Sequence, residues 1–454
     1  MKALHITEIA KAVGAETRLN ETVTSICADT RKLQAGCLFI ALSGENFDGH
    51  EFTRTALEQG AAAVLCERET GCGEKELLVD DTHLALLNLA AYYRRLFELP
   101  VIGITGSVGK TTTKEMTAAV MQSKFKTLKN EGNRNNEIGL PLTLFNLDGS
   151  YEAAVLEMGM TGFGEISCLS KTAAPMLGII TKIGVSHMEK LGSRENILKA
   201  KLEILEGMRA DAPLVLNGDD ELLINADTQG HPVYLFGIEN EACQFRACGI
   251  EQSNTDTSFT VKYSDGEQQI LLPAVGKHNI YNALAAFAVG YLMGISPADA
   301  AAALAEYVPS GMRQRIKNAK GITFIEDCYN ASPDSLRAAL SVLGGMKAKR
   351  RIAVLGDMLE LGAISEQAHS EAGLCAAKEG VDVLLTYGEK SKQTALKAQE
   401  TGVGTVKSFD DKKELAGFLS SMLVPGDAVV FKASRGMGLE DVIKIVYGEL
   451  EVDE

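Results

Sequence analysis

Short apolar runs alternate with amphipathic stretches along most of the chain, which is the pattern of repeated strand–helix units. Between residues 99 and 311, the runs VIGIT, AAVLEMG, MLGIIT and APLVLN each end at a polar or glycine-bearing turn. Such apolar strands are typical of parallel sheets covered on both faces. The segment TSFTVKYSDGEQQILL alternates instead, and its Asp265-Gly266 turn predicts an antiparallel hairpin on the flank of that sheet. A helix from about 279 to 293 is expected to close this unit.

The same alternation before and after this stretch predicts two further units. SICADTR, CLFIAL and AAVLC read as strands around the helix FTRTALEQGA, and a helix around LNLAAYYRRLFEL ends before Pro100. ITFIED, RIAVLG, VDVLLTY and DAVVFKAS are each followed by a helical stretch, which indicates a doubly wound, Rossmann-like domain. We therefore expect an α/β protein of three domains, at 1–98, 99–311 and 312–454.

Composition narrows the class of protein. The chain has 454 residues, of which 46% are hydrophobic and 23% charged, as in globular proteins. Its net charge of -15 disfavours nucleic acid as a partner. No apolar run reaches the roughly 18 residues of a membrane span, and we expect no signal peptide or membrane insertion. The nine cysteines lack a paired zinc-type spacing, which fits a reduced, cytoplasmic setting.

The segment GSVGKTTT at 106–113 lies between the strand VIGIT and a helical pattern, in the order of a phosphate-binding P-loop. Its glycines let backbone N–H groups approach phosphate oxygens, Lys110 would neutralise the terminal phosphates, and the Thr111 hydroxyl could bind Mg2+. The strict G-x-x-x-x-G-K spacing fails because position 104 is Ile. The alternative to a phosphate-binding loop is an ordinary glycine-rich turn between a strand and a helix. The sequence has no guanine-reading N-K-x-D motif, which argues against a GTPase switch.

Three further residues could hold a metal beside this loop. Glu157 and His187 follow successive buried strands, whose carboxyl ends share the sheet edge of Lys110. Lys201 falls within the apolar arc of a helix predicted from about 194 to 208, where an unpaired ammonium is unfavourable. As a carbamate, formed with carbon dioxide, it could coordinate Mg2+. The alternatives are a solvent-facing glutamate, an exposed histidine and a lysine that reaches the rim.

The segment GKHNIYNALAA at 276–286 sets Asn279 and Asn282 one turn apart near a helix start. Both side chains could recognise a nucleotide. Simple N-capping is the alternative, because asparagine is common at that position.

The sequence resembles the Mur ligases, and its segments LGDMLELG and SRGMG are most similar to the corresponding segments of the MurF type. The resemblance runs over nearly the whole chain. It rests on these motifs: DTRKLQAGCLFIALSGENFDGHEF, GITGSVGKTTTKE, GNRNNEIGLPLTL, VLEMGM, GVSHMEKLGSRENILKAKLEI, LNGDD, KHNIYNALAA, DCYNASPDS, LGDMLELG and KASRGMG. The family pattern implies an N-terminal domain that holds a UDP-linked substrate, a central ATPase domain and a C-terminal Rossmann-like domain that closes over the site.

The resemblance also implies roles for individual residues. The phosphate and magnesium positions correspond to Gly106, Ser107, Val108, Gly109, Lys110, Thr111, Thr112, Glu157 and His187, with Lys201 as the carbamylated lysine. Groups near the adenine, ribose and phosphates of ATP correspond to Asn279, Asn282, Arg313 and Asp327. The UDP-substrate segments correspond to Asp29, Thr30, Arg31, Asn46, Asp48, Gly49, His50, Asn133, Asn135 and Asn136. Loops of the MurF type that would bind the dipeptide contain Asn330, Asp357, Ser434 and Arg435.

The implied activity is ATP-dependent ligation of D-alanyl-D-alanine to UDP-N-acetylmuramoyl-tripeptide through an acyl phosphate, in cytoplasmic peptidoglycan synthesis, by a monomer. Three features depart from the family pattern. The P-loop is a variant, Thr30 stands where Ser is common, and Lys182 stands where Asn is common. The segment M-R-Q-R leaves a choice between Arg313, which we favour, and Arg315. The rival interpretations are a sibling such as folylpolyglutamate synthase, and a regulatory P-loop ATPase that ligates nothing.

Overall fold

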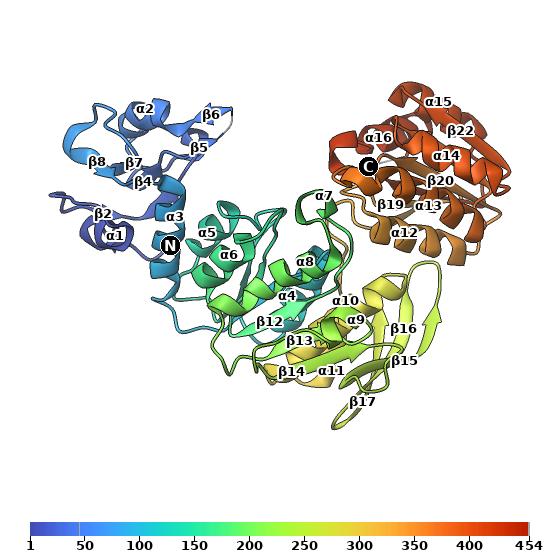
Figure 1. The fold of residues 1–454 in the computed structure, drawn as a ribbon, viewed down its shortest axis with the longest axis horizontal. Coiled ribbons are helices and arrows are strands. Elements are labelled where there is room, and N and C mark those ends of the chain that lie inside the picture. The colour runs from blue at the N-terminus through green and yellow to red at the C-terminus, as the bar shows by residue number, and fades with distance from the viewer. Residues whose placement is uncertain (45, 453–454) are drawn as a thin grey trace.

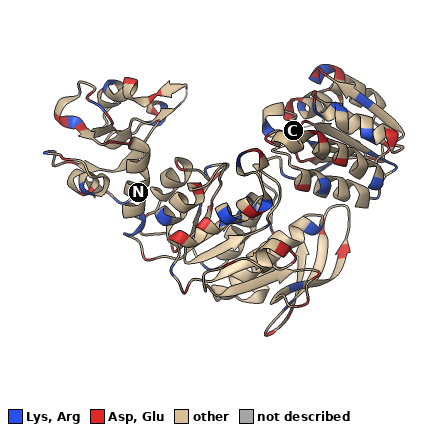
Figure 2. Cartoon of the chain, in the orientation of Figure 1, with Lys and Arg blue, Asp and Glu red and all other residues tan. Residues whose placement is uncertain are grey.

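The computed structural model describes residues 1–44 and 46–452, and three α/β bodies follow one another along the chain. The first and last bodies lie apart from each other, and both adjoin the central one (Figure 1). Each body contains a mainly parallel sheet with helices packed on it, so the α/β prediction is confirmed. Lysine and arginine are interspersed with aspartate and glutamate over all three bodies (Figure 2).

The first body is built on a parallel sheet of strand order β3-β4-β7-β8. Its strands are β3 (Ser25–Cys27), β4 (Cys37–Ile40), β7 (Ala63–Cys66) and β8 (Glu76–Leu78), with short pairs β1 (Leu4–His5)–β2 (Thr22–Val23) and β5 (Ser43–Gly44)–β6 (Phe47–Asp48). Its helices are α1 (Ile6–Val13), α2 (Thr53–Glu58) and α3 (Thr82–Arg94). The helix expected over FTRTALEQGA is shorter than its pattern at both ends: Phe52 belongs to the 3-10 turn Gly49–Phe52, and α2 ends at Glu58, shortly before Gly60 with φ +99°.

Residues 46–452 are all described by the structure, and they include the sheet of the central body, whose strand order is β10-β11-β9-β12-β13-β14-β15-β16-β17. The strands are β9 (Val101–Thr105), β10 (Thr127–Lys129), β11 (Ala153–Glu157), β12 (Leu177–Ile180), β13 (Leu214–Asn217), β14 (Val233–Gly237), β15 (Phe245–Gln252), β16 (Thr257–Tyr263) and β17 (Gly266–Leu272). Pairing is parallel from β10 to β15 and antiparallel beyond it. Tyr263 faces Gly266 across the turn, which confirms the predicted hairpin.

The helices of this body differ from the sequence prediction at two places. They are α4 (Lys110–Gln122), α5 (Gly139–Leu144), α6 (Glu165–Ala173), α7 (Met188–Leu191), α8 (Arg194–Leu202), α9 (Glu221–Ile224), α10 (Lys277–Leu292) and α11 (Pro297–Ala305). The helix expected to reach 208 changes to a 3-10 turn at Glu203, where Ser170 of α6 donates a hydrogen bond to the Ile204 carbonyl. The helix α10 does not close the body, because Ser296 caps a further helix, α11.

The third body has a sheet of order β18-β19-β23-β20-β21-β22 in the same described stretch, antiparallel only between β18 and β19. Its strands are β18 (Arg315–Ala319), β19 (Ile322–Glu326), β20 (Arg350–Gly356), β21 (Val383–Tyr387), β22 (Thr405–Phe409) and β23 (Asp427–Lys432). Its helices are α12 (Pro333–Gly345), α13 (Ser365–Lys378), α14 (Ser391–Glu400), α15 (Lys412–Met422) and α16 (Glu440–Glu449). This order is that of a doubly wound sheet with an antiparallel edge strand.

Polar side-chain contacts connect neighbouring bodies. Arg94 at the end of α3 donates hydrogen bonds to the carbonyls of Ala173, Phe97 and Leu99 at 2.7–3.0 Å. Between the central and third bodies, the Lys182 ammonium lies 3.4 Å from a carboxylate oxygen of Asp334. Within the part of the chain that the structure describes, no helix is long and apolar enough to cross a membrane.

Candidate active site

The P-loop connects the end of β9 to the start of α4 and requires glycine at two positions. Gly106 has φ +149° and Gly109 has φ +86°, which L side chains rarely adopt. A Cβ at Gly106 would lie 1.9 Å from the Thr181 hydroxyl oxygen. Thr181 also donates a hydrogen bond to the Val108 carbonyl at 2.6 Å. The loop is therefore held against the end of β12, with its backbone close to the neighbouring strand.

Lys110 begins α4 and folds back over the loop that precedes it. Its Nζ donates hydrogen bonds to the carbonyls of Gly106 at 2.8 Å and Ser107 at 3.4 Å. Burial lowers the pKa of Lys110; the Glu157 carboxylate opposes this shift, and the nearby Arg313 guanidinium adds to it. The P-loop lysine therefore lies close to one candidate metal ligand and to one arginine of the third body.

Glu157 ends β11, beside β9 in the sheet, and its carboxylate points toward the P-loop helix. The side chain is buried, with 2% of the residue exposed. The Thr111 hydroxyl donates a 2.7 Å hydrogen bond to Oε2, and Asn135 Nδ2 donates one of the same length to Oε1. Both carboxylate oxygens are thus oriented, one by the P-loop helix and one by the loop that precedes α5.

The two other asparagines of that loop have different surroundings. Asn136 accepts a 2.8 Å hydrogen bond from the Gly139 backbone N–H at the start of α5. Asn133 is exposed, and its backbone carbonyl accepts from Asn135 N–H at 2.7 Å. The sequence grouped all three residues, but only Asn135 touches the candidate metal ligand.

His187 and Lys201 follow β12 in the chain, and burial together with the charge of the P-loop lysine Lys110 lowers the pKa of both. Burial, followed by the charges of Lys110 and Lys201, lowers the pKa of His187 to about 4, so its imidazole is neutral near pH 7. Its Nδ1 lies 3.2 Å from Oε2 of Glu360 in the third body. Lys201 is 2% exposed, as its position on the apolar arc predicted. Burial, and then the charge of Lys110, lowers the pKa of Lys201 well below its ordinary value.

These residues fit a magnesium ion if Lys201 is carbamylated. In the described residues, no three His, Cys, Asp or Glu side chains come together as a ready-made ligand set. Glu157 therefore needs partners of another kind, and Thr111 supplies a hydroxyl oxygen beside it. A buried amine with a lowered pKa is the uncharged form that reacts with carbon dioxide, and its carbamate would supply the oxygens that Mg2+ prefers.

Asn279 and Asn282 lie on α10, and both are buried. Asn282 Oδ1 accepts a 3.0 Å hydrogen bond from the Thr113 hydroxyl of α4. Asn279 Nδ2 donates to the Val275 carbonyl at 2.9 Å and to the side-chain oxygen of Gln314. Neither side chain caps the helix, since Gly276 occupies the N-cap. The pair connects the P-loop helix to the segment that leads into the third body.

The third body presents charged side chains toward this region. The Arg313 guanidinium lies over the Tyr329 ring, 3.9 Å from its centre. Arg315 instead lies 3.6 Å from the buried Glu326 carboxylate. Asp327 accepts a 2.7 Å hydrogen bond from the buried Lys432 ammonium. Of the two arginines, Arg313 is the one whose charge lowers the pKa of Lys110.

The four residues expected to bind the dipeptide mostly hold loops of the third body together. Asp357 accepts hydrogen bonds from the backbone N–H groups of Ser391 at 2.8 Å and Lys390 at 3.3 Å, at the start of α14. The Ser434 hydroxyl accepts from Leu359 N–H at 2.9 Å. The other two have local partners as well: Asn330 accepts through its carbonyl from Lys432, and Arg435 pairs with Glu440.

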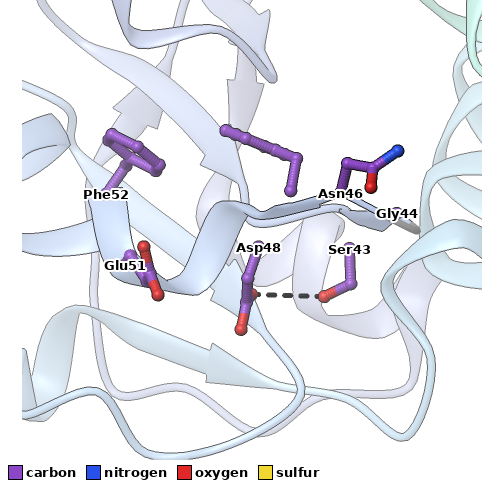
Figure 3. A pocket seen from close by; sticks show the side chains of 7 residues that line it. Ser43, Gly44, Asn46, Asp48, Glu51 and Phe52 are labelled. Carbon is purple, nitrogen blue, oxygen red and sulfur yellow. Dashed lines mark hydrogen bonds between the residues drawn. The ribbon is translucent and has the colours of Figure 1, made fainter.

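A cavity of about 460 Å³ opens at the β5–β6 hairpin of the first body, far along the chain from the P-loop. Its lining residues are Ser43, Gly44, Asn46, Phe47, Asp48, Glu51 and Phe52. Figure 3 shows the Ser43 hydroxyl hydrogen-bonded to the Asp48 carboxylate, with Asn46 on the opposite side of the backbone. The predicted residues Asn46 and Asp48 therefore share one concave surface.

Neighbouring residues fix the Asp48 carboxylate. It accepts from His50 N–H at 3.0 Å and from His50 Nδ1 at 2.7 Å, while His50 Nε2 accepts from Glu67 N–H. Gly49 lies so close to Leu42 that a Cβ would meet its carbonyl oxygen at 2.6 Å.

The three remaining predicted residues of this body, Asp29, Thr30 and Arg31, lie at the short 3-10 helix Thr30–Lys32, of which Asp29 is the N-cap. Asp29 accepts from the backbone N–H and the Nε of Arg31 at 3.1 and 2.8 Å. These hydrogen bonds lower the pKa of Asp29 to about 2.

Two buried polar residues beside the site have no counterpart in the sequence prediction. Asn130 follows β10 and bonds to the backbone of Glu157. Gln314 has φ +55° and receives hydrogen bonds at Oε1 from Asn279 and His278. The strand before Asn130 is the short, mostly polar Thr127–Lys129, so the local pattern does not distinguish Asn130 from a residue of an ordinary turn. Nothing in the local pattern marks Gln314, because its partners are distant in sequence.

The chain matches three family models along its length. Residues 22–94 match the Mur ligase family, catalytic domain; 104–290 match the Mur ligase middle domain; and 312–435 match the Mur ligase, glutamate ligase domain. A protein of Bacillus subtilis named UDP-N-acetylmuramoyl-tripeptide–D-alanyl-D-alanine ligase is 42% identical over 97% of each chain. The protein of the same name from Escherichia coli is 36% identical over 93% of each.

Solved structures agree with these relatives. MurF from Acinetobacter baumannii superposes with a TM-score of 0.92 and 30% identity over 99% of both chains. MurF ligase from Thermotoga maritima in complex with ADP gives a TM-score of 0.87 at 29% identity, over 94% of this chain and 98% of that one. Family models over all three bodies and full-length relatives above 30% identity lead to one conclusion: the chain belongs to the Mur ligase family.

Proposed function

We propose that this Mur ligase uses ATP and Mg2+ to join D-alanyl-D-alanine to UDP-N-acetylmuramoyl-tripeptide. The relatives that match it over their full length carry the name of this activity. The observation that carries the proposal is the set of contacts at the P-loop, where Thr111 donates a hydrogen bond to Glu157 near the half-buried Lys110 and the buried Lys201. That set of groups suits phosphoryl transfer to a carboxylate.

The first half-reaction makes a good leaving group from a carboxylate. The terminal carboxylate of the tripeptide attacks the γ-phosphorus of ATP, and ADP departs as an acyl phosphate forms. Lys110 and the backbone N–H groups of the P-loop hold the phosphate oxygens and spread the negative charge that develops. We assign Arg313 of the third body to the same phosphate, and its effect on the pKa of Lys110 supports this assignment.

The second half-reaction forms the amide. The free amine of D-alanyl-D-alanine attacks the acyl carbon, and the tetrahedral intermediate expels inorganic phosphate. Water must be excluded from the site until the amine attacks, because water would hydrolyse the acyl phosphate. We assign 1–98 to the UDP-substrate domain, 99–311 to the ATP domain and 312–454 to a Rossmann-like domain whose closure provides that exclusion.

We assign the metal to four side chains: Thr111, Glu157, His187 and Lys201 as its carbamate. Bound there, Mg2+ would neutralise charge on the phosphate oxygens and keep them in line with the carboxylate. The neutral imidazole of His187 keeps a nitrogen lone pair available for this role. Carbamylation would replace a costly buried amine by an anion with a cationic partner nearby.

The remaining contacts are assigned in three groups. The nucleotide contacts are Gly106, Ser107, Val108, Gly109, Lys110, Thr111, Thr112, Asn279, Asn282, Arg313 and Asp327. The UDP-substrate contacts are Asp29, Thr30, Arg31, Asn46, Asp48, Gly49, His50, Asn133, Asn135 and Asn136, which include two residues of the 460 Å³ cavity. The dipeptide contacts are Asn330, Asp357, Ser434 and Arg435. We further propose that the enzyme acts as a cytoplasmic monomer in peptidoglycan synthesis, and so supports cell shape and division.

One assay separates this function from its rivals. Purified protein receives ATP, Mg2+, D-alanyl-D-alanine and either the L-lysine or the diaminopimelate form of the UDP-muramoyl tripeptide, and ADP and product mass are followed together. The proposal requires ADP release that depends on both substrates and a product that is heavier by one dipeptide. ADP release with glutamate or a folate instead would indicate a sibling ligase. Hydrolysis without any amide product would indicate a regulatory ATPase.

A further inference from the structure

Asn130 directly follows β10, and both the nitrogen and the oxygen of its side-chain amide form hydrogen bonds with the backbone of Glu157. Asn130 Nδ2 donates to the Glu157 carbonyl at 2.9 Å, and Glu157 N–H donates to Asn130 Oδ1 at 2.9 Å. The residue is 1% exposed. Parallel pairing of β10 with β11 ends at Lys129–Val155, so the asparagine side chain continues the ladder where the backbone no longer does. The position of Glu157 at the strand end is thereby fixed by two bonds.

The same side chain also holds the loop that orients the Glu157 carboxylate. Asn130 Nδ2 donates a second hydrogen bond to the Arg134 carbonyl at 2.8 Å. The next residue, Asn135, donates from Nδ2 to Glu157 Oε1 at 2.7 Å. One amide group therefore positions both the backbone of Glu157 and the loop that contacts its carboxylate.

Asn130 is itself attached to the P-loop helix by a buried charge. The Lys114 side chain is fully buried, and its Nζ donates to the Asn130 carbonyl at 2.6 Å and lies 3.0 Å from Glu115 Oε1. A buried ammonium is retained only when its partners satisfy it. Lys114 stands three residues after Thr111 on α4, and the Thr111 hydroxyl bonds to Glu157 Oε2. The contacts thus close a ring from α4 through Asn130 and Glu157 back to α4.

We propose that Asn130 is a positioning residue that directs the Glu157 carboxylate toward the metal, with Lys114 anchoring it to the P-loop helix. This inference rests on the proposed ATP and magnesium site. Partners that orient a ligand typically change metal affinity by about 10- to 100-fold when they are removed. A residue that only supports the fold would instead lower stability without moving the magnesium requirement.

The test measures ADP binding by calorimetry at increasing Mg2+ in the full-length wild type, Asn130→Ala and Asn225→Ala. Asn225 is an exposed asparagine of the same body that bonds to the Glu221 carbonyl, which makes it the matched control. Asn130→Ala is expected to raise the Mg2+ concentration at half-effect by about 10-fold, and to leave ADP affinity without Mg2+ unchanged. The control is expected to match the wild type in both measurements.

An unchanged Mg2+ midpoint in Asn130→Ala overturns the proposal, whatever its melting temperature. If that variant does not fold, Asn130→Ser, which keeps one hydrogen-bonding group, is expected to show a smaller upward shift, and no shift overturns the proposal equally. Lys114→Met is expected to shift the midpoint in the same direction, because it releases the anchor of Asn130. If Mg2+ does not affect ADP binding in the wild type, the proposed magnesium site fails, and that result is distinct from a failure of Asn130 alone.

Discussion

Replacing Lys201 tests whether a buried lysine acts as a metal ligand after carbamylation. Lys201→Ala removes a side chain that is almost wholly inaccessible, and it leaves space beside the P-loop. Burial and the charge of Lys110 lower the pKa of the amine well below its ordinary value, so the group is poised to react as a free base. The variant loses both the amine and the carbamate that would form on it.

The expected loss in rate follows from what the carbamate would do. Removing a residue that merely orients a ligand costs about 10- to 100-fold, so removing the ligand itself should lower kcat by about 100-fold or more. A factor of 100 corresponds to about 2.7 kcal/mol of transition-state stabilisation. Lys199→Ala is the matched control, because Lys199 lies on the exposed side of the same helix, α8, and should keep its activity.

The assay follows ADP release with all substrates present, with and without added formate or acetate. A short carboxylate can enter the vacated space and replace the carbamate oxygens, so partial recovery is expected for Lys201→Ala. Asp29→Ala should show no recovery, since no ligand space is created at the P-loop. Activity of Lys201→Ala within two-fold of the wild type, or equal recovery in both variants, would refute the reasoning.

Three other changes probe the P-loop and the connection between the first two bodies. Lys110→Ala should abolish ATP turnover while UDP-tripeptide binding persists; full turnover contradicts its phosphate role. Gly106→Ala should prevent nucleotide binding, because its Cβ would lie 1.9 Å from Thr181 Oγ1. The control Gly417→Ala, whose Cβ meets no neighbouring atom, should bind nucleotide normally. Equal ADP affinity in the two variants would show that the P-loop does not require glycine at 106. Arg94→Ala leaves three carbonyls without their donor and should lower the free energy of unfolding by about 3 kcal/mol, read from denaturant unfolding, and an unchanged midpoint would count against it.

Much of the fold could be predicted from the chain because its strands are short, apolar and bounded by polar turns. The hairpin at Asp265-Gly266 and the P-loop strand both follow from local patterns. The edge strand β22 did not, since Thr405–Phe409 is mostly exposed and lacks a continuous apolar run. The helix break at Glu203 was also missed, because it depends on a contact with Ser170 of another helix.

Some residues of the candidate site could likewise be predicted from local sequence, and others could not. Burial of Lys201 followed from helical periodicity, and the strand-end position of Glu157 followed from parallel-sheet geometry. Asn130 and Gln314 could not be found, because their importance lies in hydrogen bonds to residues 27 and 35–36 positions away. Local sequence therefore predicts which groups reach the sheet edge, and tertiary contacts decide how they are oriented.

The most direct test of the central claim follows an oxygen atom. UDP-muramoyl tripeptide labelled with 18O in its terminal carboxylate is incubated with ATP, Mg2+, D-alanyl-D-alanine and the enzyme, and the released inorganic phosphate is analysed by mass spectrometry. An acyl phosphate requires one carboxylate oxygen to leave with the phosphate, so each phosphate should carry one 18O. Phosphate without label, released together with amide product, would contradict the account.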